Sequence, residues 1–274
     1  LKLSEIWTRR VYSLQDDDAK YELFMLWFDF LDQLSYLQMV DTSNLNELEK
    51  TSLYLNLYHV MVIHGSLVLF PPQTSSNWQP FFHDVAYLFS TDVLSIADVE
   101  HNVIKAKMTK PPRQIIGLGR NSQAPKSIFL DLALNHRDFR FNFCINNGSV
   151  SSPNEICIYK AETLDEQMDH MTSLSISSTI GVDVGKRQVS LPVVCSWFAP
   201  DFVSLGSLAS PIDCLRAVAL YSNVSDRSKL TSLLLSGSMP SIKYKTFTFK
   251  SRPLVLLKEK NGNVDEEELN KGEI

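Results

Sequence analysis

The sequence predicts an α+β fold in a single domain, with N-terminal and central helices packed on a small mixed or antiparallel sheet. Two observations indicate this class. Apolar residues recur at helical spacing through the chain before Pro71, and short runs rich in β-forming residues, separated by turn residues, follow later. With 274 residues, 44% of them hydrophobic, the chain can bury a substantial core.

The first part of the chain, residues 1–40, reads as a helical segment. Its apolar spacing predicts two helices broken near residues 15–18. One face collects Tyr21, Phe24, Met25, Phe28 and Leu31, which we interpret as scaffold. The main α+β domain is then expected at residues 41–257, followed by a charged, flexible tail or linker at residues 258–274.

The run from Leu53 to Phe70, LYLNLYHVMVIHGSLVLF, predicts a long helix that Pro71-Pro72 must end. Asn44 with Glu47 three residues later is expected to cap its start. Because burying an unbonded amide or imidazole costs about 1–3 kcal/mol, the polar residues in this run must find partners. They would also be costly in lipid, so we expect a buried central helix and no integral membrane segment. These polar residues are Asn56, His59 and His64.

The middle of the chain predicts short elements. Residues 85–94 suggest a hairpin, and Ser95 then caps a helix through Ile104 that carries Glu100 and His101. Breakers make residues 110–126 a loop, and Gly117-Leu118-Gly119 lacks the strand and helix of a phosphate-binding site.

The later elements follow from alternation, turn residues and caps. We expect a strand at 139–145, a turn-rich loop at 146–153 and a helix that begins with a capping box of Thr163 and Glu166. The remaining expected elements are a hairpin at 182–191, a short helix ended by Pro200, a helix at 216–234 and a last strand at 242–249. Lysines alternate with aromatic residues in this last strand, which is typical of a protected sheet edge.

Charge and cysteine content limit the function classes. A net charge of −5 and a pI near 5.7 provide no basic field for nucleic acid or anionic membranes. The four cysteines form no CxxC pair, so we expect reduced thiols and neither a zinc site nor another cofactor. No secretory signal is recognisable, and we expect a cytoplasmic protein.

Several motifs in fixed order resemble the family catalogued as domain of unknown function 547, over residues 45–204. They are Asn56-Leu57-Tyr58 followed by His64, Asp98-Val99-Glu100-His101, Gly148-Ser149-Val150-Ser151-Ser152-Pro153 with Ile158-Tyr159, and Leu191-Pro192 before Trp197 and Asp201-Phe202. Eukaryotic members share the Ser-Ser-Pro ending and are often joined to other modules. The resemblance therefore implies that the chain is an excerpt of a larger intracellular protein.

Many members of that family carry an asparagine, a histidine and a cysteine before the loop glycine, which implies a cysteine-type nucleophilic site. This sequence departs from the pattern, with Asn147 at the cysteine position, Asn142 at a histidine position and His59 at a second asparagine position. An amide cannot replace a thiolate as a nucleophile. Our leading hypothesis is a non-catalytic protein-interaction or scaffold module, a degenerate relative of a possibly enzymatic family, with a protein as its partner.

Two other hypotheses stay open. In the first, a hydrolase or acyl-transfer enzyme uses a serine of the loop around Gly148 with His64 as base, and Asn56 or Asn147 donates to an oxyanion. In the second, a small-molecule site keeps its polar pocket without chemistry. For His64 the alternative is a satisfied core histidine, and for Glu100 it is a surface ion pair with Lys105 or Arg113.

The candidate residues are therefore of two kinds. A metal site is not expected, because the histidine and carboxylate spacings match no zinc signature. The candidates for catalysis are His64, Asn56, Glu100, His101 and Ser149. The candidates for ligand binding are Tyr58, His59, Asn142, Asn147, Ser151 and Ser152.

Overall fold

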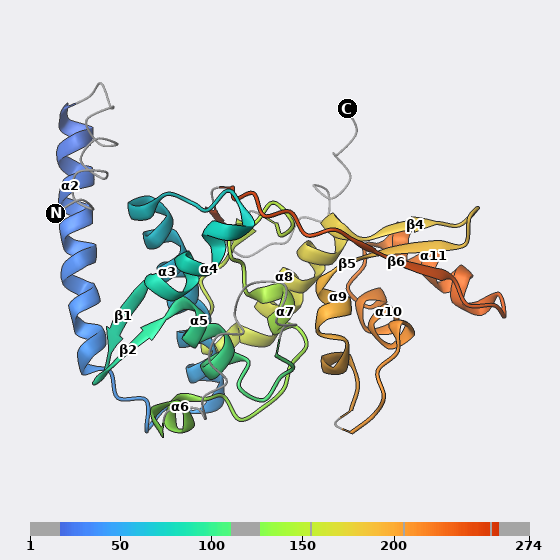
Figure 1. Cartoon of the computed structure of the whole chain (residues 1–274), viewed down its shortest axis with the longest axis horizontal. Helices are drawn as coiled ribbons and strands as arrows, with labels where there is room; N and C mark the ends of the chain where they lie inside the picture. Colours follow the sequence, from blue (N-terminus) through green and yellow to red (C-terminus); the bar gives the residue numbers. More distant parts are fainter. Residues whose placement is uncertain (1–16, 111–126, 154, 205, 253, 258–274) are drawn as a thin grey trace.

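The computed structural model describes residues 17–110, 127–153, 155–204, 206–252 and 254–257. In these residues the α+β class is confirmed, with helices around two sheets of two strands and one of three (Figure 1). The three-stranded sheet is mixed, as expected. The first predicted N-terminal helix, Arg113, the glycine loop at 111–126 and the tail at 258–274 lie outside the described residues.

The helices α2 (Asp17–Ser35) and α3 (Glu47–Leu69) are joined through the short helix η1 (Tyr36–Met39). The predicted cap of α3 is wrong by two residues. Asn46, not Asn44, accepts from the N–H groups of Leu48 and Glu49, and the Glu49 carboxylate accepts from the Asn46 N–H. Because the Asn-x-x-Glu pattern occurs twice in succession, the sequence did not distinguish the two starts. The predicted end before Pro71-Pro72 is confirmed.

A hairpin and a capped helix follow, as predicted. Strands β1 (Ala86–Phe89) and β2 (Asp92–Ser95) pair antiparallel. Ser95 then caps α5 (Ile96–Asp98), which continues as the π-helix η2 (Val99–Ile104). Two helices, α4 (Ser75–Asp84) and α6 (Ser127–Leu132), were not predicted from the sequence.

The predicted strand at 139–145 is wrong, because its centre forms the short helix α7 (Phe141–Cys144). All four residues of α7 are buried, and a short apolar run without a polar side looks the same in a strand and a helix. Helix α8 (Leu164–Thr179) begins where expected, after the turn η4 (Ala161–Thr163). The Thr163 side chain makes no capping bond, so the predicted capping box is wrong.

The C-terminal half contains the mixed sheet of β4 (Gly181–Asp183), β5 (Gln188–Pro192) and β6 (Ser241–Lys245). The predicted hairpin is confirmed in β4 and β5, and β6 is an edge strand of this sheet. It is shorter than predicted and is not the last strand, since β7 (Val255–Leu256) pairs parallel with β3 (Glu155–Ile156).

Four short helices cover this half of the fold. They are α9 (Val194–Trp197), η5 (Ala199–Phe202), α10 (Pro211–Ala219) and α11 (Val224–Leu235). The single helix predicted at 216–234 is wrong, because Asn223 starts a new helix by accepting from the Asp226 N–H. The predicted short helix is α9, but Pro200 does not end it. Pro200 lies instead in the first turn of the next helix, η5.

Two apolar clusters make up the core. One gathers α3, α4, the β1–β2 hairpin and η2, and the other gathers the three-stranded sheet with α10 and α11. Helix α8 joins them, because Met168 and Met171 lie in the first cluster and Ile176 in the second. Figure 1 shows α8 and α7 between the two halves, with α2 at one end of the molecule and the mixed sheet at the other.

Helix α3 is long and apolar enough to cross a membrane by length and composition alone. In this fold 56% of its apolar window is buried by the rest of the protein. The core helix of a globular domain passes the same test, so this is weak evidence for a membrane span.

Candidate functional site

The loop at residues 146–153, which carries the Gly-Ser motif, is a pair of side-chain turns. Asn146 Oδ1 accepts from the Gly148 N–H at 3.0 Å, and Asn147 Oδ1 accepts from the Ser149 N–H at 3.0 Å. Gly148 has φ +79°, a conformation that side chains with a Cβ rarely adopt. The amide of Asn147 thus stabilises the turn.

A C-terminal segment, residues 248–252, fixes this loop from outside. The Val150 N–H donates to the Lys250 carbonyl, and the Arg252 N–H donates to the Gly148 carbonyl, both at 2.8 Å. Ser149 Oγ donates to the Thr248 carbonyl, and the Thr248 N–H donates to Ser151 Oγ. The serine hydroxyls at 149 and 151 are therefore partners of the backbone.

Two polar residues of α3 hold the loop from inside. Asn56 pairs with the backbone of Tyr159, donating to its carbonyl and accepting from its N–H, both at 2.8 Å. His59 Nε2 accepts from the Asn146 N–H at 3.1 Å, and its ring stacks on Tyr159. Burial lowers the pKa of His59 to about 4, against a backbone contact with Cys144 that raises it. At neutral pH this imidazole is uncharged and serves the loop's backbone.

Glu100 lies in a buried charge cluster. Lys105 Nζ lies 2.9 Å from Glu100 Oε1, and the Tyr58 hydroxyl donates to Oε2 at 3.0 Å. Burial by itself would raise the pKa of Glu100. The charges of Lys105 and His101 and the hydrogen bonds from Lys105 and Tyr58 outweigh this effect and lower the pKa to about 2. Lys105 pairs as expected, yet the side chains of Lys105 and Glu100 are only 4% and 13% exposed, so the predicted surface location is wrong.

His101 belongs to the same cluster. Its Nε2 lies 4.0 Å from Glu100 Oε1, although neighbouring residues on a helix point in different directions. Its carbonyl accepts from Lys110 Nζ. Burial lowers the pKa of His101 to about 4; Glu100 opposes this shift, while the charges of Lys105 and Lys110 reinforce it. The side chains of Glu100 and His101 therefore lie near each other, next to the fully buried Tyr58.

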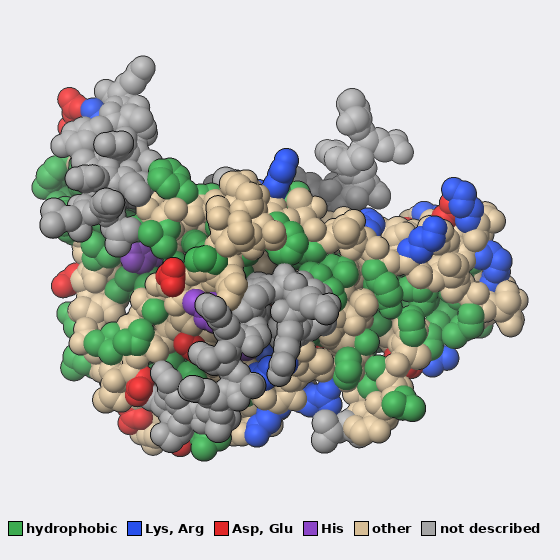
Figure 2. Space-filling model, in the orientation of Figure 1, with side chains coloured by type: hydrophobic (Ala, Val, Ile, Leu, Met, Phe, Trp, Pro, Cys, Tyr) green, Lys and Arg blue, Asp and Glu red, His purple; other side chains and the backbone are tan. Residues whose placement is uncertain are grey.

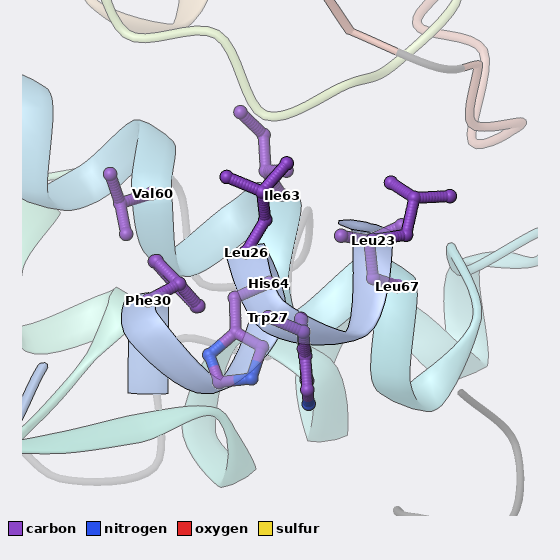
Figure 3. Close-up of a pocket in the computed structure, with 8 residues that line it drawn as sticks. All are labelled: Leu23, Leu26, Trp27, Phe30, Val60, Ile63, His64 and Leu67. Carbon is purple, nitrogen blue, oxygen red and sulfur yellow. The ribbon is translucent and has the colours of Figure 1, made fainter. Parts of the chain in front are cut away.

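His64 lies in a different part of the molecule. Its Nδ1 is 2.6 Å from the Tyr87 hydroxyl, and its ring packs edge-on against Trp27 and Phe30 of α2. Burial lowers its pKa. Figure 3 shows it in an apolar groove of about 240 Å³ between α2 and α3. The groove residues are Leu23, Leu26, Trp27, Phe30, Val60, Ile63, His64 and Leu67.

The described structure does not assemble the base and nucleophile of the hydrolase hypothesis. His64 bonds Tyr87, and Ser149 Oγ bonds Thr248 and Ser151. The histidine that does contact the loop is His59, which accepts a backbone N–H. Cys144, the nearest thiol in sequence, is fully buried, and burial raises its pKa to about 12, although bonds from Tyr159 and Thr172 lower it. A thiol in this state is a poor nucleophile.

Three predicted ligand-binding residues meet at one cavity of about 250 Å³, which we call the loop cavity. They are Asn142, Ser151 and Ser152. The end of α8, the start of α9 and the segment after β6 supply the other walls. Tyr58, His59 and Asn147 do not line it; Tyr58 and His59 are buried in the core, and Asn147 lies within its own turn.

A buried carboxylate supports the cavity wall. Asp201 Oδ2 accepts from Asn142 Nδ2 at 3.2 Å, and its Oδ1 accepts from the backbone and hydroxyl of Thr109, both at 2.8 Å. Arg137 Nη2 lies 3.4 Å from the same oxygen. The role of Asp201 was not predicted, although Asp201-Phe202 belongs to the motifs that carry the family resemblance.

The outer face of α2 carries exposed apolar side chains. Tyr21, Met25 and Phe28 are exposed by 66%, 52% and 61%, at the i, i+4, i+7 spacing of one helix face. We call this set the outer α2 stripe. The prediction that these residues are scaffold is therefore wrong, because α2 packs on α3 through Trp27 and Phe30 instead.

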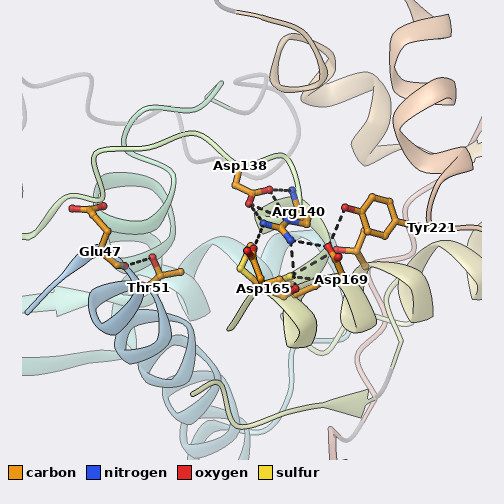
Figure 4. A network of polar contacts seen from close by, with 10 residues as sticks. Glu47, Thr51, Asp138, Arg140, Asp165, Asp169 and Tyr221 are labelled. Carbon is orange, nitrogen blue, oxygen red and sulfur yellow. Dashed lines mark hydrogen bonds and ion pairs between the residues drawn. The ribbon is translucent and has the colours of Figure 1, made fainter. Parts of the chain in front are cut away.

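A polar cluster beside α8 serves the fold rather than a site. Arg140 donates to Asp138, Asp165 and Asp169 at 2.6 to 2.7 Å, and Asp169 also accepts from the Tyr221 hydroxyl (Figure 4). One guanidinium thus ties the start of α7 to α8 and to the turn after α10. Among the residues described, no three His, Cys, Asp or Glu side chains gather closely enough to hold a metal ion.

Comparison with known proteins agrees with the resemblance drawn from the motifs. Residues 42–174 match a protein family described as "Protein of unknown function, DUF547". No curated protein and no solved structure matches the chain.

Proposed function

We propose that this chain, whose residues 42–174 match the DUF547 family, is a non-catalytic protein-interaction module of a larger intracellular protein. The outer α2 stripe is the observation that carries the proposal. Contiguous exposed apolar side chains on one helix face are typical of a protein interface. The partner is a protein with a complementary apolar ridge.

The charges beside the stripe specify the partner further. Glu22 and Asp29, seven residues apart, lie together along one side of the stripe, and both are exposed. Asp32, in the last full turn of α2, is exposed as well. A partner whose apolar ridge is bordered by lysine or arginine would gain attraction, and an acidic partner would be repelled. The proposed ligand is therefore a basic amphipathic helix.

The loop supports the non-catalytic part of the proposal. The position of the family's cysteine holds Asn147, and that amide bonds the loop's own backbone. Ser149 and Ser151 also bond backbone groups, so the loop's polar atoms stabilise its conformation. These contacts favour a degenerate relative that kept the fold of the loop.

The experiment uses two designed helical peptides with the same leucine ridge, one bordered by lysines and one by glutamates. Binding of each labelled peptide is measured by fluorescence anisotropy at low and high salt. We expect the lysine peptide to bind about tenfold or more tightly than the glutamate peptide, with the difference reduced at high salt. The double variant Met25→Glu, Phe28→Glu should lose this binding.

Leu235→Glu is the matched control, because Leu235 is 80% exposed but lies on α11. It should bind the lysine peptide like the wild type. Equal binding of both peptides, or binding that survives the double variant, would contradict the proposal. Light scattering adds a further check: a dimer that Met25→Glu dissociates would assign the stripe to a second copy and refute the basic partner.

A further inference from the structure

We infer that the free edge of β6 binds an extended acidic peptide, which adds to the mixed sheet as an antiparallel strand. This inference is independent of the proposed function, because β6 and the outer α2 stripe share no residue and lie at opposite ends of the molecule (Figure 1). It starts from the side of β6 that pairs with no other described strand.

The register of the sheet identifies the free backbone groups of β6. The strand pairs parallel with β5 and, among the described strands, with no other. The Ser241 N–H donates to the Arg187 carbonyl at 2.8 Å, so the backbone of Ser241 points toward β5. Because backbone groups alternate between the two sides of a strand, those of Ile242 and Tyr244 point away from β5. Their N–H and carbonyl groups form an open edge that can pair with another chain.

Two lysines flank the residues of this edge. Lys243 and Lys245 are exposed on one face of β6, while Ile242 and Tyr244 pack on the other face in the apolar cluster with α10 and α11. The β5 residues opposite the lysines are uncharged, and no acidic side chain of the described residues pairs with either lysine. Figure 2 shows further Lys and Arg side chains at this end of the molecule. The edge therefore presents unpaired positive charge.

Backbone and charge together define the peptide. In the antiparallel orientation, which is slightly more stable per residue than the parallel one, two alternate peptide residues exchange both hydrogen bonds with Ile242 and Tyr244. The peptide residues opposite Lys243 and Lys245 then lie on the exposed face, with Cβ atoms about 4.5–5.5 Å from those of the lysines. Opposite charges in such cross-strand pairs are stabilising. Glutamates at alternate positions, separated by β-branched residues, fit this edge.

The same lysines exclude a second copy of β6 as the partner. Two β6 edges in an antiparallel pair would bring lysine against lysine, and like charges directly opposite each other are destabilising. Lysines thus protect this edge from pairing with itself, as their position on an edge strand predicts. An acidic strand meets no such repulsion.

The test uses capped, labelled peptides and the whole chain. The acidic peptide is Thr-Glu-Val-Glu-Val-Thr, and its charge-reversed partner has lysine in place of both glutamates. Binding is measured by fluorescence anisotropy at low and high salt. We expect the acidic peptide to bind about tenfold or more tightly than the lysine peptide, with the difference reduced at high salt.

Two methylated peptides separate strand pairing from charge alone. Methylating the nitrogen of the valine between the glutamates removes the N–H that would donate to the Tyr244 carbonyl, and should weaken binding about tenfold or more. Methylating the nitrogen of the glutamate between the valines alters an N–H that points away from β6, so the Kd should change less than about threefold. Hydrogen exchange adds a direct readout. The acidic peptide should slow exchange at Ile242 and Tyr244 more than at Lys243, whose N–H already points toward β5.

A charge-reversed protein locates the binding. The double variant Lys243→Glu, Lys245→Glu should lose the acidic peptide and bind the lysine peptide about tenfold or more tightly than the wild type does. Lys107→Glu is the matched control, because Lys107 is also an exposed lysine but lies in the turn after η2. It should bind the acidic peptide like the wild type.

Several outcomes would overturn the inference. They are equal binding of the two methylated peptides, a greater loss from methylating the glutamate, unaltered binding in the double variant, and no binding of the acidic peptide at about 1 mM. An oligothymidylate that binds more tightly than the acidic peptide would assign the lysines to nucleic acid and would overturn it as well.

Discussion

Replacing Lys105 with methionine should destabilise the fold strongly at neutral pH. Methionine keeps much of the length of the side chain and its contact with Phe198, whose ring centre lies 4.7 Å from Nζ. Among the described residues it removes the only lysine or arginine within 4 Å of the Glu100 carboxylate, and His101, with a pKa of about 4, carries no charge at pH 7. The variant therefore leaves a buried carboxylate without its counter-charge.

The expected loss follows from the burial of the pair. The side chains of Lys105 and Glu100 are 4% and 13% exposed, and removing one partner of a buried ion pair costs about 3–5 kcal/mol. The pKa of Glu100 gives a similar figure. A shift from 4.5 to about 2 corresponds to about 3 kcal/mol of stability. That stability is present above pH 4.5 and lost as the pH falls toward 2.

The pH dependence of the loss is distinctive. Without Lys105, burial should raise the pKa of Glu100 above its ordinary value, so the carboxyl takes up a proton as the pH falls from neutral. A protonated carboxyl needs no cation. The difference in unfolding free energy between wild type and variant should therefore be largest at pH 7 and smaller at about pH 5.

Urea unfolding at the two pH values measures this difference. Lys186→Met is the control, because its partner Asp183 is on the surface and the lysine side chain is 78% exposed, so a loss below about 1 kcal/mol is expected. The double variant Glu100→Gln, Lys105→Met should recover part of the loss. A loss under about 1 kcal/mol in Lys105→Met, or an equal loss at both pH values, would refute the reasoning.

Two further predictions concern the polar residues of α3. The folded pKa of His59 is about 4 against an ordinary 6.5, so stability is full above pH 6.5 and falls as the pH drops toward 4. The variant His59→Asn keeps an oxygen that can accept the backbone N–H but does not titrate. In urea unfolding it should reduce the difference in unfolding free energy between pH 7 and pH 4.5 by about 2–3 kcal/mol. An unaltered difference would count against the neutral, buried state of His59. Asn56→Leu leaves the backbone N–H and carbonyl of Tyr159 unpaired and should cost about 2–4 kcal/mol, with Asn56→Asp intermediate because it keeps the acceptor. A leucine variant as stable as the wild type would show that water replaces both bonds.

The candidate site was predictable in residue type more than in arrangement. The expectation that Asn56, His59 and His64 need partners is confirmed, since each has a hydrogen bond to a residue distant in sequence. Their partners were not predictable. His64 meets Tyr87 and α2, while Asn56 meets Tyr159. A helix turns successive polar residues toward different neighbours, and the identity of those neighbours depends on how the chain folds back.

The sequence by itself determined the elements whose signals are local. Helix α3 ends before a proline pair, Ser95 caps its own helix, and the β4–β5 hairpin turns at a glycine, because caps, prolines and turn residues act within a few residues of themselves. The strand predicted at 139–145 was wrong because all four residues of α7 are buried, so the run shows neither the helical nor the strand periodicity.

Tertiary structure alone decided which polar groups share a site. Asn142 lines the loop cavity, and its amide nitrogen donates to Asp201, 59 residues later. Lys105 is buried because Tyr58 packs against its partner Glu100 and the Phe198 ring lies beside its own ammonium. It also left the outer α2 stripe exposed, since α2 packs on α3 through its other face. Hydrogen bonds and burial between distant segments depend on three-dimensional packing, for which sequence spacing carries no signal.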